Sequence, residues 1–186
     1  MKVIIIQSSP NKDGLTSACA KAAEEGVVSA GGQVDMVFLN QLNVGSCQAC
    51  NKGWGTCLED HTCQKEDDFQ NLHESIKKAN AYIIVTPVYW GEPSESTKNL
   101  LDRIRRCEAT RGDDSYLYQK PVIGIAAAGG SGGGMITCLS SLEHWIHHVQ
   151  ARIYDLIPVN RWSKSYKLVT IRYAADAMVK AVSESQ

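Results

Sequence analysis

Residues 3–17 read VIIIQSSPNKDGLTS, and this stretch decides the fold. The apolar run is typical of a fully buried strand, and the hydroxyl-rich segment after it leads into an alanine-rich helical pattern. A helix N-terminus presents unpaired N–H groups and a partial positive charge, so this order predicts an anion site. Ser9, Thr16 and Ser17 add hydroxyl donors. The loop is therefore interpreted as a phosphate-binding segment.

Composition narrows the class of protein. The chain has 186 residues, of which 44% are apolar, and a net charge of -1. These values favour one domain over residues 1–186 with a substantial core, and they argue against disorder. No long basic run points to nucleic acid, and no apolar stretch approaches membrane-spanning length. We expect a soluble, cytoplasmic protein that binds neither nucleic acid nor membrane.

Continuous apolar segments alternate with amphipathic ones along the chain. Strands are expected at residues 2–7, 33–39, 81–86, 121–127 and 152–157, and helices at about 14–30, 67–79, 94–107, 135–150 and 166–182. This alternation predicts an α/β, flavodoxin-like, doubly wound parallel sheet of order 2-1-3-4-5 with helices on both faces. Ligands bind such sheets beyond the carboxyl ends of the strands, where loops 8–17, 87–93 and 128–134 meet.

These three loops favour a flavin over other phosphate ligands. The chain has no G-x-x-x-x-G-K-[ST] motif, and no G-x-G-x-x-G follows its first strand. The second loop carries the adjacent pair Tyr89 and Trp90, which could flank a planar ring, with core packing or an oligomer interface as the alternative. The glycine run 129–134 permits close backbone approach, or else serves as a flexible connection. Together the loops make FMN the natural ligand.

Several motifs, in this order and spacing, resemble a known family. They are the segment 9–16, the pair Cys47 and Cys50 in C-x-x-C, CQKEDDF at 63–69, TPVYWG at 86–91, and the helix 94–103 with LLDR. Over residues 1 to about 160 the chain resembles the NAD(P)H-dependent FMN reductase branch of the flavodoxin-like family, and its iron–sulfur flavoprotein relatives in particular.

The resemblance implies a set of FMN contacts. The phosphate would be held by Ser9, Asn11, Thr16 and Ser17, with Leu15 of the same loop counted among the cofactor-binding residues. The ring and ribityl chain would be lined by Pro87, Val88, Tyr89, Trp90, Gly91, Gly129 and Gly130. The chain departs from the family where Ser8 replaces glycine, Asn11 a basic residue, Leu15 asparagine, and Trp90 a phenylalanine or small residue.

Four cysteines lie in the long loop 40–65, at Cys47, Cys50, Cys57 and Cys63. Four thiolates can hold a [4Fe–4S] cluster or a tetrahedral zinc, the latter with His61 as a further ligand. A redox-active disulfide and a packed loop without metal are the alternatives. Iron–sulfur relatives carry a third cysteine where Gly53 stands. The remaining cysteines, at 19, 107 and 138, are expected to be core residues.

The resemblance implies an FMN-dependent NAD(P)H oxidoreductase that passes electrons to a quinone, flavin, nitro compound, metal ion or protein. The alternatives are an iron–sulfur flavoprotein with a ferredoxin-like partner, and a non-enzymatic flavodoxin-like binding protein. A homodimer or homotetramer is expected, with Trp54 and Trp90 at the seam. The basic cluster of Arg103, Arg105, Arg106 and Arg111 is expected on the surface, with binding of nicotinamide-cofactor phosphates as the alternative.

Overall fold

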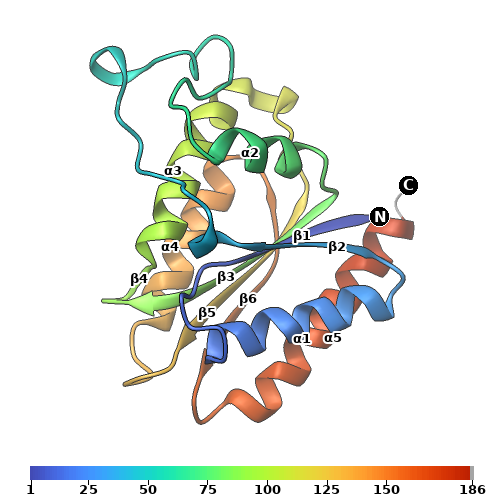
Figure 1. The fold of residues 1–186 in the computed structure, drawn as a ribbon. Coiled ribbons are helices and arrows are strands. Elements are labelled where there is room, and N and C mark those ends of the chain that lie inside the picture. The colour runs from blue at the N-terminus through green and yellow to red at the C-terminus, as the bar shows by residue number, and fades with distance from the viewer. Residues whose placement is uncertain (185–186) are drawn as a thin grey trace.

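The computed structural model describes residues 1–184 and is built on one twisted sheet (Figure 1). Its parallel strands are β1 (Lys2–Gln7), β2 (Gln33–Phe38), β3 (Ala81–Tyr89), β5 (Pro121–Ala128) and β6 (Arg152–Asn160). They are ordered β2-β1-β3-β5-β6, and each neighbouring pair is parallel. The predicted flavodoxin-like order is confirmed.

Helices cover both faces of this sheet. They are α1 (Leu15–Ser29), α2 (Phe69–Lys77), α3 (Glu95–Glu108), α4 (Met135–His148) and α5 (Lys164–Glu184), with short 3-10 turns η1 (Leu39–Gln41), η2 (Asn51–Gly53) and η3 (Ala109–Asp114). In Figure 1, α1 and α5 lie on one face and α2, α3 and α4 on the other. The last helix extends two residues beyond each predicted end. None of the helices within residues 1–184 has the length and apolar character needed to span a membrane.

The strand period of two divides the core between these faces. Ile4 and Ile6 of β1 pack with α2, α3 and α4 in one buried cluster. Val3 and Ile5 pack with α1 and α5 in the other. A strand that is buried on both faces needs apolar residues at every position, which is why residues 3–6 form a continuous apolar run.

The third strand is longer than predicted. The sequence prediction ended this strand at residue 86 and made 87–93 a turn, but β3 continues to Tyr89 and pairs antiparallel with a short strand, β4 (Glu92–Pro93). Trp90 and Gly91 form the two-residue connection, with φ of 53° and 80°. Positive φ at both central positions is the geometry of a type I′ hairpin turn. The aromatic pair therefore sits at the end of a hairpin beyond the sheet.

Candidate functional site

The loop between β1 and α1 folds back on itself at the carboxyl end of β1. Ser8 still donates its N–H to the Val85 carbonyl at 3.2 Å, so the loop leaves the sheet only after this residue. The Ser9 hydroxyl oxygen accepts the N–H of Asn11 at 3.2 Å, and the Asn11 side chain accepts the N–H of Asp13 at 3.1 Å. These local bonds are typical of Asx and Ser turns, and they bring the chain into α1.

The N-terminus of α1 offers unpaired donors to this loop. Gly14 is the N-cap residue and provides no side-chain cap. Among the described residues, the backbone N–H groups of Leu15, Thr16 and Ser17 have no hydrogen-bond partner, and neither has the Thr16 hydroxyl. The Ser9 hydroxyl accepts a bond but its own proton remains free. These groups match an anion at the helix N-terminus.

Ser17 differs from the other predicted phosphate donors. Its hydroxyl donates to the Asn11 carbonyl at 3.0 Å and accepts from the Gln7 side chain at 2.8 Å. The proton of Ser17 is therefore engaged in shaping the loop, and Ser9 and Thr16 are the hydroxyls left to meet a ligand. Asn11 uses its side-chain oxygen within the loop.

A buried cluster of hydroxyl groups, which the sequence prediction missed, joins this loop to the start of α3. The Ser8 hydroxyl accepts from Thr97 at 2.6 Å and from Ser94 at 3.0 Å. Ser94 caps α3, as predicted, and its N–H donates to Thr86 at 3.0 Å. All four residues are buried. In the sequence, only the departure at Ser8 from the resembled pattern pointed to this cluster.

The β3–β4 hairpin projects its aromatic residues away from the core. Trp90 is fully exposed and Tyr89 is half exposed, so core packing within this chain does not explain them. Pro87 is buried and Val88 is half-buried. Tyr89 and Pro10 line the same cavity of about 220 Å³. This cavity therefore lies between the first loop and the hairpin.

The glycine-rich loop after β5 contacts the hairpin through backbone. A Cβ added at Gly134 would lie 2.7 Å from the Cα of Gly91, so a side chain at this position would clash with the hairpin backbone. Gly134 has a φ of 77° and is the N-cap residue of α4. Gly129 and Gly130 are exposed and have open space where a Cβ would be. The three predicted loops thus adjoin one another at one edge of the sheet, and they leave room beside Gly129 and Gly130.

The four loop cysteines are not brought together. Cys47 is exposed, Cys50 is half-buried, and Cys57 and Cys63 pack against the core on the α2 and α3 side. Within residues 1–184, no three Cys, His, Asp or Glu side chains form a group able to hold a metal. As the loop is arranged, these residues do not fit a four-cysteine cluster or zinc site.

The other three cysteines are core residues, as predicted. Cys19, Cys107 and Cys138 are all buried. Burial raises the pKa of each thiol to about 12, because desolvation penalises the thiolate. They are therefore poor nucleophiles and poor metal ligands in the folded protein.

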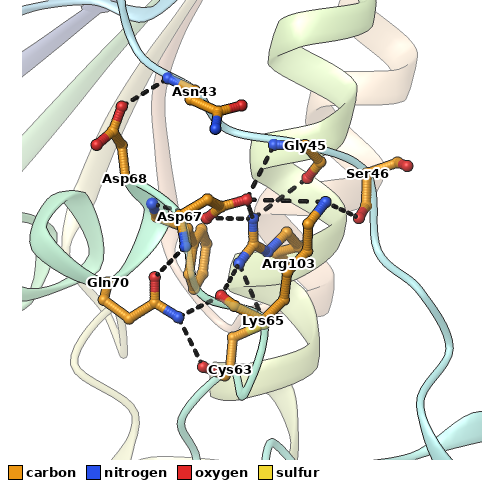
Figure 2. A network of polar contacts seen from close by, with 10 residues as sticks. Asn43, Gly45, Ser46, Cys63, Lys65, Asp67, Asp68, Gln70 and Arg103 are labelled. Carbon is orange, nitrogen blue, oxygen red and sulfur yellow. Dashed lines mark hydrogen bonds and ion pairs between the residues drawn. The ribbon is translucent and has the colours of Figure 1, made fainter.

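Arg103 corrects the prediction of a surface arginine cluster. Its side chain is 1% exposed, and it holds the cysteine loop in place (Figure 2). The guanidinium pairs with Asp67 at 2.6 Å and donates to the carbonyls of Gly45 and Lys65 at 3.2 and 3.1 Å. It also lies 3.2 Å from the Cys63 sulfur. These contacts make Arg103 a structural residue. The sequence prediction missed this role because the partner carboxylate, Asp67, lies 36 residues earlier in the chain.

Hydrogen bonds and charge attraction keep Asp67 and Arg103 ionised. Burial alone would raise the pKa of Asp67, but hydrogen bonds from Arg103 and from the N–H groups of Phe69 and Gly45 outweigh it and hold the pKa below its ordinary value. The guanidinium also stacks over the Phe69 ring, 4.2 Å from its centroid. Its Nε has no partner among the described residues. The contact network fixes where the long loop leaves and re-enters the fold.

Trp54, a predicted seam residue, is half-buried within its own loop. The Arg106 guanidinium lies 4.4 Å from the centre of the Trp54 ring and donates to the Gly53 carbonyl at 2.5 Å. The second α3 arginine therefore also binds the cysteine loop. The role of Trp54 as a subunit contact stays a prediction, as does that of Trp90.

Comparison with known proteins places this arrangement among flavoproteins. Residues 1–157 match the family model described as NADPH-dependent FMN reductase. A protein named iron-sulfur flavoprotein from Methanosarcina thermophila is 29% identical over 147 residues, covering 79% of this chain and 73% of its own. Another of that name, from Methanocaldococcus jannaschii, is 26% identical over 187 aligned positions, covering 100% of this chain and 88% of its own. The solved NAD(P)H:quinone oxidoreductase from Methanothermobacter marburgensis shares the fold, with a TM-score of 0.73 at 18% identity over 96% of each chain.

Proposed function

Because the chain belongs to the NADPH-dependent FMN reductase family, we propose that it is an FMN-dependent NAD(P)H oxidoreductase that passes electrons to a second acceptor. The observation that carries this proposal is the unpaired N-terminus of α1, which lies beside the free hydroxyls of Ser9 and Thr16 at the carboxyl end of β1. When bound, FMN would supply hydride and electron transfer. The acceptor would be a small molecule or a protein.

In this proposal the protein contributes binding and orientation. The N–H groups of α1, with Ser9 and Thr16, would neutralise and orient the phosphate. The β3–β4 hairpin would border the ring through backbone and through Tyr89 and Trp90. The open space beside Gly129 and Gly130 would accept the remainder of the cofactor. No side chain is required as an acid or base for hydride transfer.

We expect Thr16→Ala and Ser9→Ala each to raise the dissociation constant of FMN about tenfold or more. A hydrogen bond to a charged group contributes about 1.5–3 kcal/mol. Among the described residues, Thr16→Ala removes no hydrogen bond of the fold, whereas Ser9→Ala also removes the acceptor of the Asn11 N–H. Quenching of FMN fluorescence during titration with the apoprotein measures the effect. Thr170→Ala, an exposed hydroxyl on α5, is the matched control.

Three outcomes would contradict this proposal. Wild-type protein that does not bind FMN after reconstitution would remove the proposed function itself. Wild-type affinity in both Ser9→Ala and Thr16→Ala would remove the assigned phosphate site. Bound FMN without oxidation of NADH or NADPH by any acceptor would favour a non-enzymatic binding protein.

A second candidate is an iron–sulfur flavoprotein that exchanges electrons with a ferredoxin-like protein. It is favoured by the names of the relatives and by the four cysteines of the loop. The described arrangement of those cysteines does not assemble a ligand set. Iron and acid-labile sulfide analysis of anaerobically purified protein distinguishes the two candidates, since absence of both elements would exclude this one.

A further inference from the structure

The segment that joins β6 to α5 is a fourth loop at the edge of the sheet where the three predicted loops meet. A Cβ added at Gly132 of the glycine-rich loop would lie 2.6 Å from the Trp162 ring and 3.4 Å from the Cβ of Asn160. The side-chain oxygen of Asn160 accepts the N–H groups of Trp162 and Ser163 at 3.1 and 2.9 Å, which fixes the turn into α5. The start of α5 is therefore held beside the glycine-rich loop.

The three predicted loops carry too little positive charge for a phosphate. Lys12 is their only cation, and the carboxylates of Asp13 and Glu92 oppose it. The resembled pattern has a basic residue where Asn11 stands. A phosphate monoester carries about −1.5 to −2 charge at pH 7, whereas a helix N-terminus offers only about +0.5. A phosphate at this edge would thus be left largely without a counter-charge.

The fourth loop and the start of α5 carry the missing charge. Arg161 and Lys164 are exposed cations, and no acidic residue occurs in the sequence between Asp155 and Asp176. The Arg161 guanidinium lies 4.4 Å from the centre of the Trp162 ring. Within residues 1–184, the Lys164 ammonium makes no hydrogen bond or ion pair. Its three donors are therefore open to a ligand.

The register between α1 and α5 places Lys164 level with the N-terminus of α1. The two helices lie side by side on one face of the sheet (Figure 1), and a Cβ added at Gly26 of α1 would clash with the backbone of α5. Farther along, the Ser29 hydroxyl donates to the Asp176 carboxylate at 3.1 Å across a separation of 147 positions. Both helices run in the same direction and rise about 1.5 Å per residue. The same separation brings Lys164 beside Ser17, in the first turn of α1.

The charge of Lys164 is felt within α1. Burial raises the pKa of the Cys19 thiol to about 12, and the positive charge of Lys164 acts in the opposite direction. Cys19 lies just over one turn from the start of α1. Lys12, in contrast, lines a cavity with Met36 and Phe38 on the β2 side of α1. The two lysines thus approach the helix from different sides, and Lys164 approaches it from the side of α5.

We propose that Lys164 is the cation that binds the phosphate of the flavin cofactor. This inference rests on the proposed function and adds a binding residue to the same site. The flexible four-carbon stem of lysine lets the ammonium reach over the first turn of α1 and donate to a phosphate oxygen that the helix N–H groups leave open. Because the family model ends at residue 157, Lys164 belongs to the part of this chain that the model does not match.

The test compares FMN with riboflavin, which has the same ring and ribityl chain but no phosphate. Quenching of flavin fluorescence during titration with the apoprotein gives both dissociation constants. Lys164→Gln should raise the constant for FMN about tenfold, because a charge-assisted hydrogen bond is lost, and should leave the constant for riboflavin unchanged. Lys164→Arg should keep the FMN constant within about threefold of the wild type. The effect of Lys164→Gln should shrink in about 1 M salt, which screens exposed charges.

Two further variants make the test specific. Lys180→Gln removes the same charge from an exposed position farther along α5 and should leave both constants unchanged. Lys12→Gln removes the other lysine and should have a smaller effect on FMN than Lys164→Gln. A wild-type FMN constant in Lys164→Gln, an equal loss of riboflavin binding, or a larger loss in Lys12→Gln would each overturn the inference and leave the proposed function standing. A wild type that binds no FMN after reconstitution would overturn both.

Discussion

Arg103→Met lowers the free energy of unfolding by about 3–5 kcal/mol, which is the expected effect of breaking a buried ion pair. The substitution keeps the unbranched apolar stem of the side chain but removes the guanidinium and all of its donors. Asp67 then remains as a buried carboxylate without its main partner, and the carbonyls of Gly45 and Lys65 lose their donors. Urea denaturation followed by far-UV circular dichroism measures the change.

Two variants make this experiment specific. Arg105→Met removes a neighbouring, partly exposed arginine of the same helix, and we expect it to change the unfolding free energy by no more than about 0.5 kcal/mol. Adding Asp67→Asn to Arg103→Met should recover part of the loss, because the unpaired buried charge is gone. Equal denaturation midpoints for Arg103→Met and Arg105→Met would show that the pair does not stabilise the fold.

The fold was accessible from the sequence because its signals are local. The apolar run 3–6 and the helical patterns after each strand establish a parallel sheet, and the right-handed crossover rule limits its order. The hairpin after β3 was missed because its turn lacks the usual local signal. Type I′ turns are usually marked by Asn-Gly or Asp-Gly, whereas here Trp90 takes the first left-handed position. A bulky side chain in that position gives no turn signal.

The site was predictable in location but not in its supporting contacts. The three loops follow from strand order, and the donors of α1 follow from the helix end that residues 3–17 predict. The partners that shape the site lie far apart in sequence: Ser8 contacts Thr97, and Arg103 contacts Asp67. Nothing in the local pattern of α3 distinguishes the buried Arg103 from the partly exposed Arg105. Such pairings become visible only when the tertiary arrangement is known.

Glu108→Ala is expected to lower the free energy of unfolding by about 3–5 kcal/mol, comparable with the loss at Arg103. Glu108 has no exposed surface, and its carboxylate meets the His73 ring at 2.7 Å, the Ser115 hydroxyl at 3.0 Å and the Tyr116 N–H at 3.0 Å. Its removal leaves all three without that partner and opens a cavity beneath η3. Urea denaturation at pH 7 measures the change.

The exposed ion pair of the same helix provides the control. Asp102 binds Lys98 at 2.6 Å in an i,i+4 arrangement on the surface. Asp102→Ala should therefore cost no more than about 0.5 kcal/mol. If Asp102→Ala and Glu108→Ala lowered the free energy of unfolding equally, the buried contacts of Glu108 would stabilise the fold no more than the exposed ion pair does.

The pH dependence of stability tests the same carboxylate in the wild type. Burial alone would raise the pKa of Glu108, but hydrogen bonds from His73, Tyr116 and Ser115 outweigh it and lower the pKa below its ordinary value. The unfolded state therefore binds a proton more readily than the folded one, so the contribution of Glu108 is complete above about pH 4.5 and is lost as the pH falls through the folded pKa. Asp67 acts in the same direction.

The unfolding free energy of the wild type should fall steeply below about pH 4.5, and Glu108→Gln should make that fall shallower. An identical acid slope in Glu108→Gln would contradict the assignment, because the proton uptake would then belong to other carboxylates.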